Sequence, residues 1–195
     1  MVATSCNYEL RWLGFLHISC TVMDLSAFTS ANTPVFSFAG REMRARLLDV
    51  YDGDTVTVAA EVYPGTVRQL SIRLTGIDTP EMKGGDLEGG ADPAEAARRR
   101  LAQLLAPAAT AAGALEGVRT AAGRVKRADM RAALQARVNL VYVTCFGNDK
   151  YGRVLARVSS WAGGPHAGDV LLAEGLATPY FGGAKRPTDR QTNEA

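Results

Sequence analysis

The sequence predicts an α+β fold in which five short β-strands form a small closed barrel, with helices set between and after the strands. Five runs rich in apolar and β-branched residues lie between positions 46 and 159, and turn signals containing Gly or Asp bound them. Two further segments carry helix signals, but strands and helices do not alternate regularly, which favours a barrel over a parallel sheet. The 195 residues, 47% of them hydrophobic, suffice for the core of one such domain.

The first three strands are expected at 46–51, 55–60 and 67–75. The first two are separated by Asp52-Gly53-Asp54, a segment whose residue types favour a tight turn. The third alternates apolar and polar side chains, as a strand with one buried face does. These segments therefore predict three consecutive strands, the first two joined by a short acidic turn.

The first helix is expected after a Gly-rich loop at 83–91. Asp92 is well placed as its N-cap, because its carboxylate can accept a hydrogen bond from a main-chain N–H of the first turn. Pro93 suits the first helical position, which needs no N–H donor. The helix is predicted to continue through Leu105.

Two more strands are expected at 138–144 and 153–159, joined by a loop that contains glycine. A short helix is then predicted at 170–174, and Gly175 stops it. With these elements the predicted order is three strands, a helix, two strands and a short helix.

An Ala- and Gly-rich insertion at about 106–136 separates the first helix from the fourth strand. From 94 to 137 the chain holds nine basic residues against three acidic ones, a local net charge of +6. A solvated helical face is the favoured interpretation of these charges, and a nucleic-acid contact surface is the alternative. The basic residues are Arg98, Arg99, Arg100, Arg119, Arg124, Lys126, Arg127, Arg131 and Arg137.

The ends of the chain are predicted to lie outside the barrel domain, which is expected over 44–183. Residues 1–43 form an N-terminal leader that belongs to no recognised motif, and it is expected to be disordered or a weak targeting segment. Its apolar run at 12–23 is shorter than the ~20 residues that cross a bilayer, so no transmembrane segment is expected. Residues 184–195 are expected to be a polar tail. An intracellular location is slightly favoured, with secretion as the alternative if residues 1–23 act as a signal.

Composition argues against several kinds of site. Three widely spaced cysteines form neither a disulfide framework nor a metal-binding C-x-x-C pair. The two histidines have no neighbouring candidate ligands, which argues against a zinc site. The formal net charge of +2 does not by itself indicate a nucleic-acid-binding protein.

Four short motifs carry the residues that suggest chemistry. Taken singly, each is more often a turn or a charge at the edge of a strand. Together they supply carboxylates, which collect hard cations, and guanidinium groups, which bind phosphate oxygens. This combination is typical of a site that holds and cuts a phosphodiester. The motifs are Asp52-Gly-Asp-Thr55, Arg73-Leu-Thr-Gly-Ile-Asp-Thr-Pro-Glu81, Asp149-Lys-Tyr-Gly-Arg153 and Glu174-Gly-Leu-Ala177.

In their order and spacing these motifs resemble those of the staphylococcal nuclease (thermonuclease) family, over about Ala45 to Gly182. The resemblance implies a five-stranded OB-type β-barrel with helices. It also implies calcium-dependent hydrolysis of DNA and RNA, with little sequence specificity because phosphate contacts read no bases.

The resemblance assigns the metal site residue by residue. The carboxylates of Asp54 and Asp78 would be ligands of Ca²⁺, and Thr79 would contribute its main-chain carbonyl oxygen. Glu81 would hold or activate the attacking water. Such hard oxygen donors are those that Ca²⁺ prefers.

The resemblance likewise assigns the contacts with substrate. Arg73 and Arg153 would bind the phosphate and stabilise the charge that develops on it. Lys150 and Tyr151 would flank the bound nucleotide, and so would Tyr180. Stacking on Tyr151 would favour single-stranded substrate.

Two classes of function follow from these residues. The complete set of acids and arginines favours an active nuclease with Ca²⁺ as cofactor and DNA or RNA as substrate. A non-catalytic OB-type nucleic-acid-binding module is the alternative, although such a module has no need for clustered acids beside phosphate. No stable protein partner is implied, and a monomer is expected.

Overall fold

The computed structural model describes residues 24–82, 92–110 and 124–181 of the chain. It divides into two units, residues 1–36 and residues 37–195. In the first unit, the described residues 24–36 form turns. In the second, the described residues form all the helices and strands considered below. The Gly-rich loop, part of the insertion, and most of the leader and tail lie outside the described residues.

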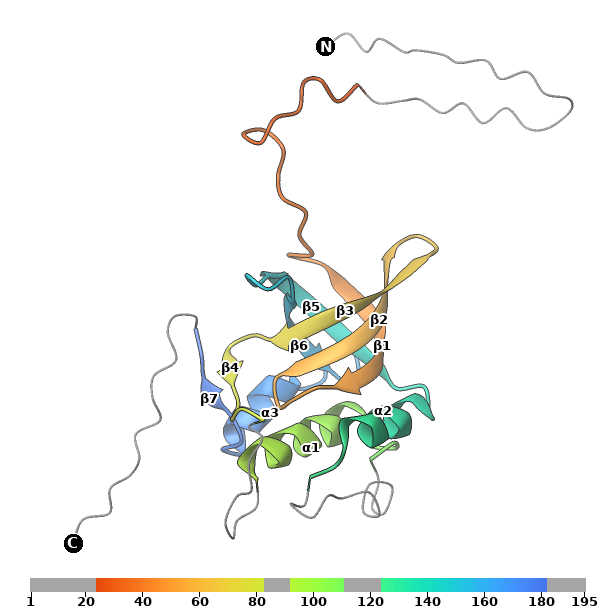
Figure 1. Ribbon diagram of the computed structural model, residues 1–195, viewed down its shortest axis with the longest axis vertical. Coiled ribbons are helices and arrows are strands. Elements are labelled where there is room, and N and C mark those ends of the chain that lie inside the picture. Colours follow the sequence, from red (N-terminus) through yellow and green to blue (C-terminus); the bar gives the residue numbers. More distant parts are fainter. Residues whose placement is uncertain (1–23, 83–91, 111–123, 182–195) are drawn as a thin grey trace, which may run out of the picture. The chain divides into compact units, whose positions relative to one another are not determined.

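Five strands of the second unit close into a barrel with the order β1-β2-β3-β6-β5 (Figure 1). Neighbouring strands are antiparallel except β3 and β6, which are parallel. This confirms the predicted five-stranded barrel. The strands are β1 (Glu42–Val50), β2 (Thr55–Tyr63), β3 (Thr66–Leu74), β5 (Leu140–Asn148) and β6 (Val154–Ser159).

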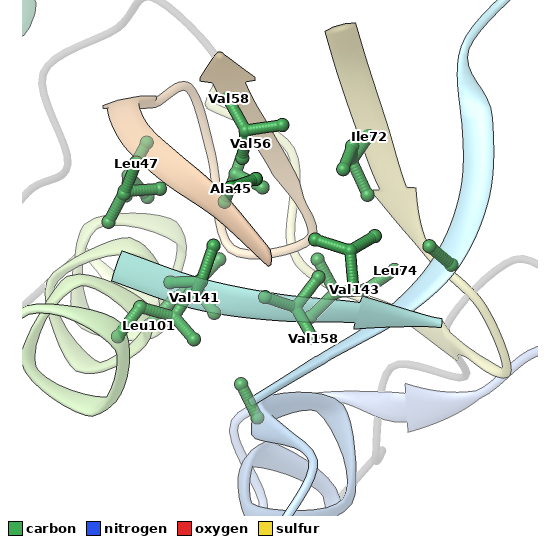
Figure 2. Packing of buried hydrophobic residues seen from close by; sticks show 14 of the residues in the cluster. Ala45, Leu47, Val56, Val58, Ile72, Leu74, Leu101, Val141, Val143 and Val158 are labelled. Atoms are coloured by element: carbon green, nitrogen blue, oxygen red, sulfur yellow. The ribbon is translucent and has the colours of Figure 1, made fainter. Parts of the chain in front are cut away.

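The barrel encloses an apolar core, which α1 (Pro93–Leu105) helps to complete. Inward-facing residues alternate with outward-facing ones along each strand, as the pleat of a strand requires. Figure 2 shows side chains from all five barrel strands gathered with Leu101 of α1. The labelled core residues are Ala45, Leu47, Val56, Val58, Ile72, Leu74, Leu101, Val141, Val143 and Val158.

Helix α1 begins where the sequence predicts. The Asp92 carboxylate accepts a hydrogen bond from the main-chain N–H of Ala94 at 3.0 Å, and Pro93 occupies the first helical position. A second helix, α3 (Ala167–Ala173), begins three residues before the predicted 170. No helix among the described residues is long and apolar enough to cross a membrane.

The structure contains three elements that the sequence did not predict. Helix α2 (Arg127–Gln135) lies within the insertion and packs against β1. Strands β4 (Ile77–Asp78) and β7 (Thr178–Pro179) form a separate two-stranded antiparallel sheet. This small sheet fixes the segment that carries Asp78, directly after β3.

The basic residues near the insertion are largely engaged within the protein. Arg98 is only 2% exposed, so the expected solvated helical face is wrong for this residue. Its guanidinium donates hydrogen bonds to the main-chain carbonyls of Val50 and Val125 at 3.0 Å and pairs with Glu95 at 3.3 Å.

The arginines of α2 and of the segment before it also have carboxylate partners. Arg127 and Arg131 pair with the buried Asp49 at 2.7 and 2.8 Å. Arg124 pairs with Asp92, the N-cap of α1. These ion pairs join the insertion to the barrel and to α1.

Candidate active site

The motif residues converge at one edge of the barrel. Thr55, at the start of β2, pairs with Arg73 near the end of β3. Strand β6 runs parallel to β3 on its other side, which brings Arg153, just before β6, to the same edge. The side chains of Thr55 and Arg153 approach within 3.4 Å.

Arg73 lies at the centre of this edge between two carboxylates. One of its terminal nitrogens pairs with Asp54, and the other donates to Asp78 Oδ1 at 2.8 Å and to the main-chain carbonyl of Ile77 at 3.3 Å. The side chain is only 13% exposed. Burial alone would lower the pKa of Arg73, but the two carboxylates outweigh it and raise that pKa. The guanidinium is therefore held charged and in a fixed orientation.

Asp54 connects β2 to the segment that follows β4. Its Oδ1 accepts a hydrogen bond from the Thr55 hydroxyl at 2.9 Å. Its Oδ2 accepts bonds from the main-chain N–H and the hydroxyl of Thr79, each at 3.2 Å. The carboxylate is buried, so these donors and Arg73 together compensate for its lost hydration.

The close approach of these segments depends on Gly53. A Cβ atom at this position would lie 2.7 Å from Cβ of Ala97 on α1 and 2.8 Å from the Thr79 hydroxyl oxygen. Such contacts are too short for any side chain, so only glycine lets the acidic turn pack between α1 and Thr79. From sequence, Gly53 is recognisable only as a turn residue.

Asp52 is a second titratable group of the acidic turn that the sequence analysis assigned to the turn alone. Its carboxylate accepts a hydrogen bond from the main-chain N–H of Asp54 at 3.1 Å. Burial, and then the negative charge of Asp54, raise the pKa of Asp52 to about 6. Asp52 therefore ionises less readily than an ordinary aspartate.

Replacing Asp52 by asparagine should stabilise the chain at neutral pH without divalent cations. Because the folded-state pKa is raised, ionisation of Asp52 destabilises the folded state. This destabilisation is complete above pH 6 and disappears as the pH falls toward 3.8, the ordinary pKa of the group. Asp52→Asn should thus raise the free energy of unfolding by about 1–2 kcal/mol near neutral pH and by much less near pH 4. Urea unfolding at both pH values measures the difference. An equal gain at both would contradict this cause.

Arg153 is positioned by Asp149, whose role the sequence analysis did not predict. One carboxylate oxygen of Asp149 accepts a hydrogen bond from Arg153 Nε at 2.7 Å. The other oxygen accepts hydrogen bonds from the main-chain N–H groups of Tyr151 and Arg153, each at 2.9 Å. Burial would raise the pKa of Asp149, but the bonds from Arg153 outweigh it and lower that pKa. Bonding through Nε leaves the terminal nitrogens of Arg153 directed elsewhere, one of them toward Thr55.

Aromatic rings flank both arginines. The Tyr151 ring is 73% exposed, with Lys150 Nζ 5.0 Å and the Arg153 guanidinium carbon 5.6 Å from its centroid. The Tyr180 ring centroid lies 5.9 Å from the guanidinium carbon of Arg73. The predicted substrate-binding residues thus lie next to the predicted phosphate-binding arginines.

Glu81 follows the segment that carries Asp78 and Thr79. It is exposed and follows Asp78 by three residues, beyond the end of β4. This predicted catalytic acid is therefore accessible to solvent.

The donor chemistry of this edge suits a hard divalent cation. Ca²⁺ prefers several oxygen ligands, and the carboxylates of Asp54 and Asp78 and the carbonyl of Thr79 are of that type. Within 24–82, 92–110 and 124–181, no three His, Cys, Asp or Glu side chains are grouped so that they could hold a metal ion. A cation here would have to share the carboxylates of Asp54 and Asp78 with Arg73.

Comparison with known proteins agrees with this geometry. The family model described as staphylococcal nuclease homologue matches residues 71–195, well over half of the chain. The match includes Arg73, the segment from Asp78 to Glu81, and the segment from Asp149 to Arg153. No curated protein matches the chain. The barrel, the order of the motifs and the family match together show that the chain belongs to the staphylococcal nuclease homologue family, which points to a nuclease or nucleic-acid-binding function.

Proposed function

We propose that the chain is a calcium-dependent nuclease that hydrolyses phosphodiester bonds of DNA or RNA with little sequence specificity. The observation that carries this proposal is the placement of two oriented guanidinium groups, Arg73 and Arg153, at one edge with the buried Asp54 and the partly buried Asp78. A protein that only bound nucleic acid would gain nothing from acids beside the phosphate, because they repel it.

The two arginines would act on the same phosphate. Thr55 lies between them. Its hydroxyl donates a hydrogen bond to Asp54, the partner of Arg73, and the same hydroxyl accepts a hydrogen bond from Arg153. A phosphate bound at this point would meet guanidinium groups from β3 and from the start of β6. Because guanidinium donors match the oxygens of phosphate in pairs, they would orient it and stabilise the charge that develops during attack.

The acids would hold the cation and direct the water. Asp54, Asp78 and the carbonyl of Thr79 are the proposed ligands of Ca²⁺, which when bound supplies charge neutralisation and a polarised water. Glu81, exposed beyond β4, would orient this water or accept its proton. Arg73 becomes more available to phosphate when its carboxylate partners are shared with a cation, so binding of cation and of substrate should reinforce each other.

The flanking aromatic rings favour a single-stranded or frayed substrate. Tyr151 is largely exposed beside Arg153, and Tyr180 lies beside Arg73. Unpaired bases can stack on such rings whatever their identity. Phosphate contacts and stacking together position the nucleic acid without reading its sequence.

Cleavage should depend on calcium. The proposed ligands are hard oxygens in a loose arrangement, which Ca²⁺ accepts, whereas Mg²⁺ demands tighter octahedral geometry. Hydrolysis of single-stranded DNA should therefore be lost with a calcium-selective chelator, return with added Ca²⁺, and be poorly supported by Mg²⁺. Full activity in Mg²⁺ after complete removal of Ca²⁺ would contradict the assignment of the cation.

A further inference from the structure

We propose that a single-stranded nucleic acid continues from the active site across the outer face of β6, β5 and β1, where a second binding surface meets it. This surface, called the strand face below, consists of Arg157, Phe146, Tyr142 and Arg44. The inference rests on the proposed function, because it names the form of the substrate and the path that the bound strand follows beyond the active site.

The strand face is continuous with the active site through β6. Val154, Ala156 and Val158 are buried, so Arg153, Leu155 and Arg157 occupy the outward positions that alternate with them. Leu155 pairs with Arg73 of β3.

The separation along β6 suits a nucleic-acid strand. Arg157 lies four residues beyond Arg153, a distance of about 13 Å along a strand. A single strand covers this length with no more than about four stacked nucleotides. The same strand could therefore contact both arginines.

Arg157 and Phe146 form the part of the strand face nearest the active site. The guanidinium carbon of Arg157 lies 5.8 Å from the centroid of the Phe146 ring, which is on β5 and 52% exposed. The pairing of β5 with β6 shifts register between Cys145 and Gly147, so Phe146 lies at an irregularity of the ladder. An exposed ring beside an exposed guanidinium offers a base a stacking surface and a phosphate a charge partner.

The strand face extends to β1 by way of β5. Tyr142 of β5 pairs directly with Arg44 of β1, which is exposed. Thr144 of β5 pairs with Arg157 of β6 on one side and with the exposed Glu42 of β1 on the other. Glu42 is the acidic residue beside the strand face. Two arginines against one glutamate leave the face positive, which complements a phosphate backbone.

The charges of the strand face differ from those near the insertion. Arg98, Arg127 and Arg131 pair with internal carboxylates. Among the residues that the structure describes, no carboxylate forms an ion pair with Arg157 or Arg44. The strand face therefore presents exposed positive charge on the barrel strands, apart from these ion-paired arginines.

The test compares how tightly long and short oligonucleotides bind. The intact chain and its Arg157→Ala and Phe146→Ala variants are titrated, in chelator, with single-stranded DNA of about 2 nucleotides, too short to contact both arginines, and of about 16 nucleotides, and fluorescence anisotropy is followed. Arg68→Ala is the matched control, because Arg68 is an exposed arginine near the other end of β3. We expect the unaltered chain to bind the long strand at least about tenfold more tightly than the short one. Each test variant should lose most of this advantage, and the control should keep it.

The same titrations at several salt concentrations give a second readout. Arg157→Ala should reduce the salt dependence of long-strand binding by about one released counterion, whereas Phe146→Ala should not. If Phe146→Ala fails to fold, as far-UV circular dichroism would show, Arg157→Glu at the exposed position supplies the second variant. No preference for the long strand in the unaltered chain, or an unchanged preference in the Arg157 variants, would overturn the proposal.

Failure of this inference and failure of the proposed function are distinguishable. Binding is measured without cation, so it does not depend on cleavage. A chain that never cleaves but loses its preference for the long strand in the Arg157 variants would refute the nuclease function alone. A chain that cleaves with Ca²⁺ but shows no such loss would refute the strand face alone.

Discussion

Replacing Arg153 by lysine should lower kcat by about two to three orders of magnitude and leave the free energy of unfolding nearly unchanged. The guanidinium uses Nε to bond Asp149 and keeps its terminal nitrogens for the proposed phosphate site. Lysine carries a single ammonium group, which can pair with Asp149 or with the phosphate but cannot reproduce both contacts. The side chain is 30% exposed, so the substitution opens no cavity in the core.

The control for this experiment is Arg100→Lys. Arg100 also forms a two-point contact with a carboxylate, donating to both oxygens of Glu174 at 2.6 and 2.7 Å. It joins α1 to the end of α3, and its carboxylate partner is not one of the predicted site residues. Steady-state hydrolysis of single-stranded DNA by both variants should show a large loss for Arg153→Lys and almost none for Arg100→Lys. Near-normal kcat in Arg153→Lys would refute the phosphate-binding role.

Replacing Arg98 by alanine should lower the free energy of unfolding by about 3–5 kcal/mol. Arg98 is 2% exposed and Glu95 is 4% exposed, so removing the guanidinium leaves an uncompensated buried carboxylate. The carbonyls of Val50 and Val125 would lose their donors at the same time. The change should therefore loosen the contact between α1, the end of β1 and the segment before α2.

Urea unfolding of Arg98→Ala and Arg100→Ala provides a matched comparison two positions apart on α1. The Arg100 ion pair is partly exposed, and such pairs contribute at most about 1 kcal/mol. If the two variants lost equal stability, the buried network around Arg98 would not stabilise the fold as described.

The sequence predicted the barrel well because local signals and packing agree there. The turn at Asp52–Asp54 and the alternation along β3 lie where the structure has them. The cap by Asp92 sets the first residue of α1. Its carboxylate accepts a hydrogen bond from a first-turn main-chain N–H that has no acceptor within the helix. These signals act over a few residues and can be recognised without knowledge of the rest of the chain.

The elements that were missed depend on contacts between distant residues. Helix α2 is rich in Ala and Arg and lies in a stretch with no cap that the sequence reveals; its N-cap Lys126 makes no side-chain hydrogen bond. Its arginines form ion pairs with Asp49, 78 and 82 residues earlier in the chain. Strands β4 and β7 have two residues each, and their pairing joins segments one hundred residues apart. Neither length nor composition marks such short strands.

The same division applies to the candidate site. Asp54, Asp78, Arg73 and Arg153 could be predicted because their residue types and spacing match a known family, and the structure brings them to one barrel edge. Contacts within the site could not be predicted. The bond of Asp149 to Arg153 and the packing of Gly53 against α1 follow from the folded backbone and have no signature in residue type.

Following binding and cleavage of one labelled oligonucleotide in the same sample tests the central claim most directly. The intact chain is mixed with 5′-labelled single-stranded DNA in Ca²⁺, anisotropy reports binding, and gel analysis of timed samples reports cleavage. The proposed nuclease predicts products that accumulate with time, stop on chelation, and are nearly absent with Arg153→Lys at equal occupancy. Saturated binding in Ca²⁺ with no products would contradict the nuclease function and identify the chain as a nucleic-acid-binding module.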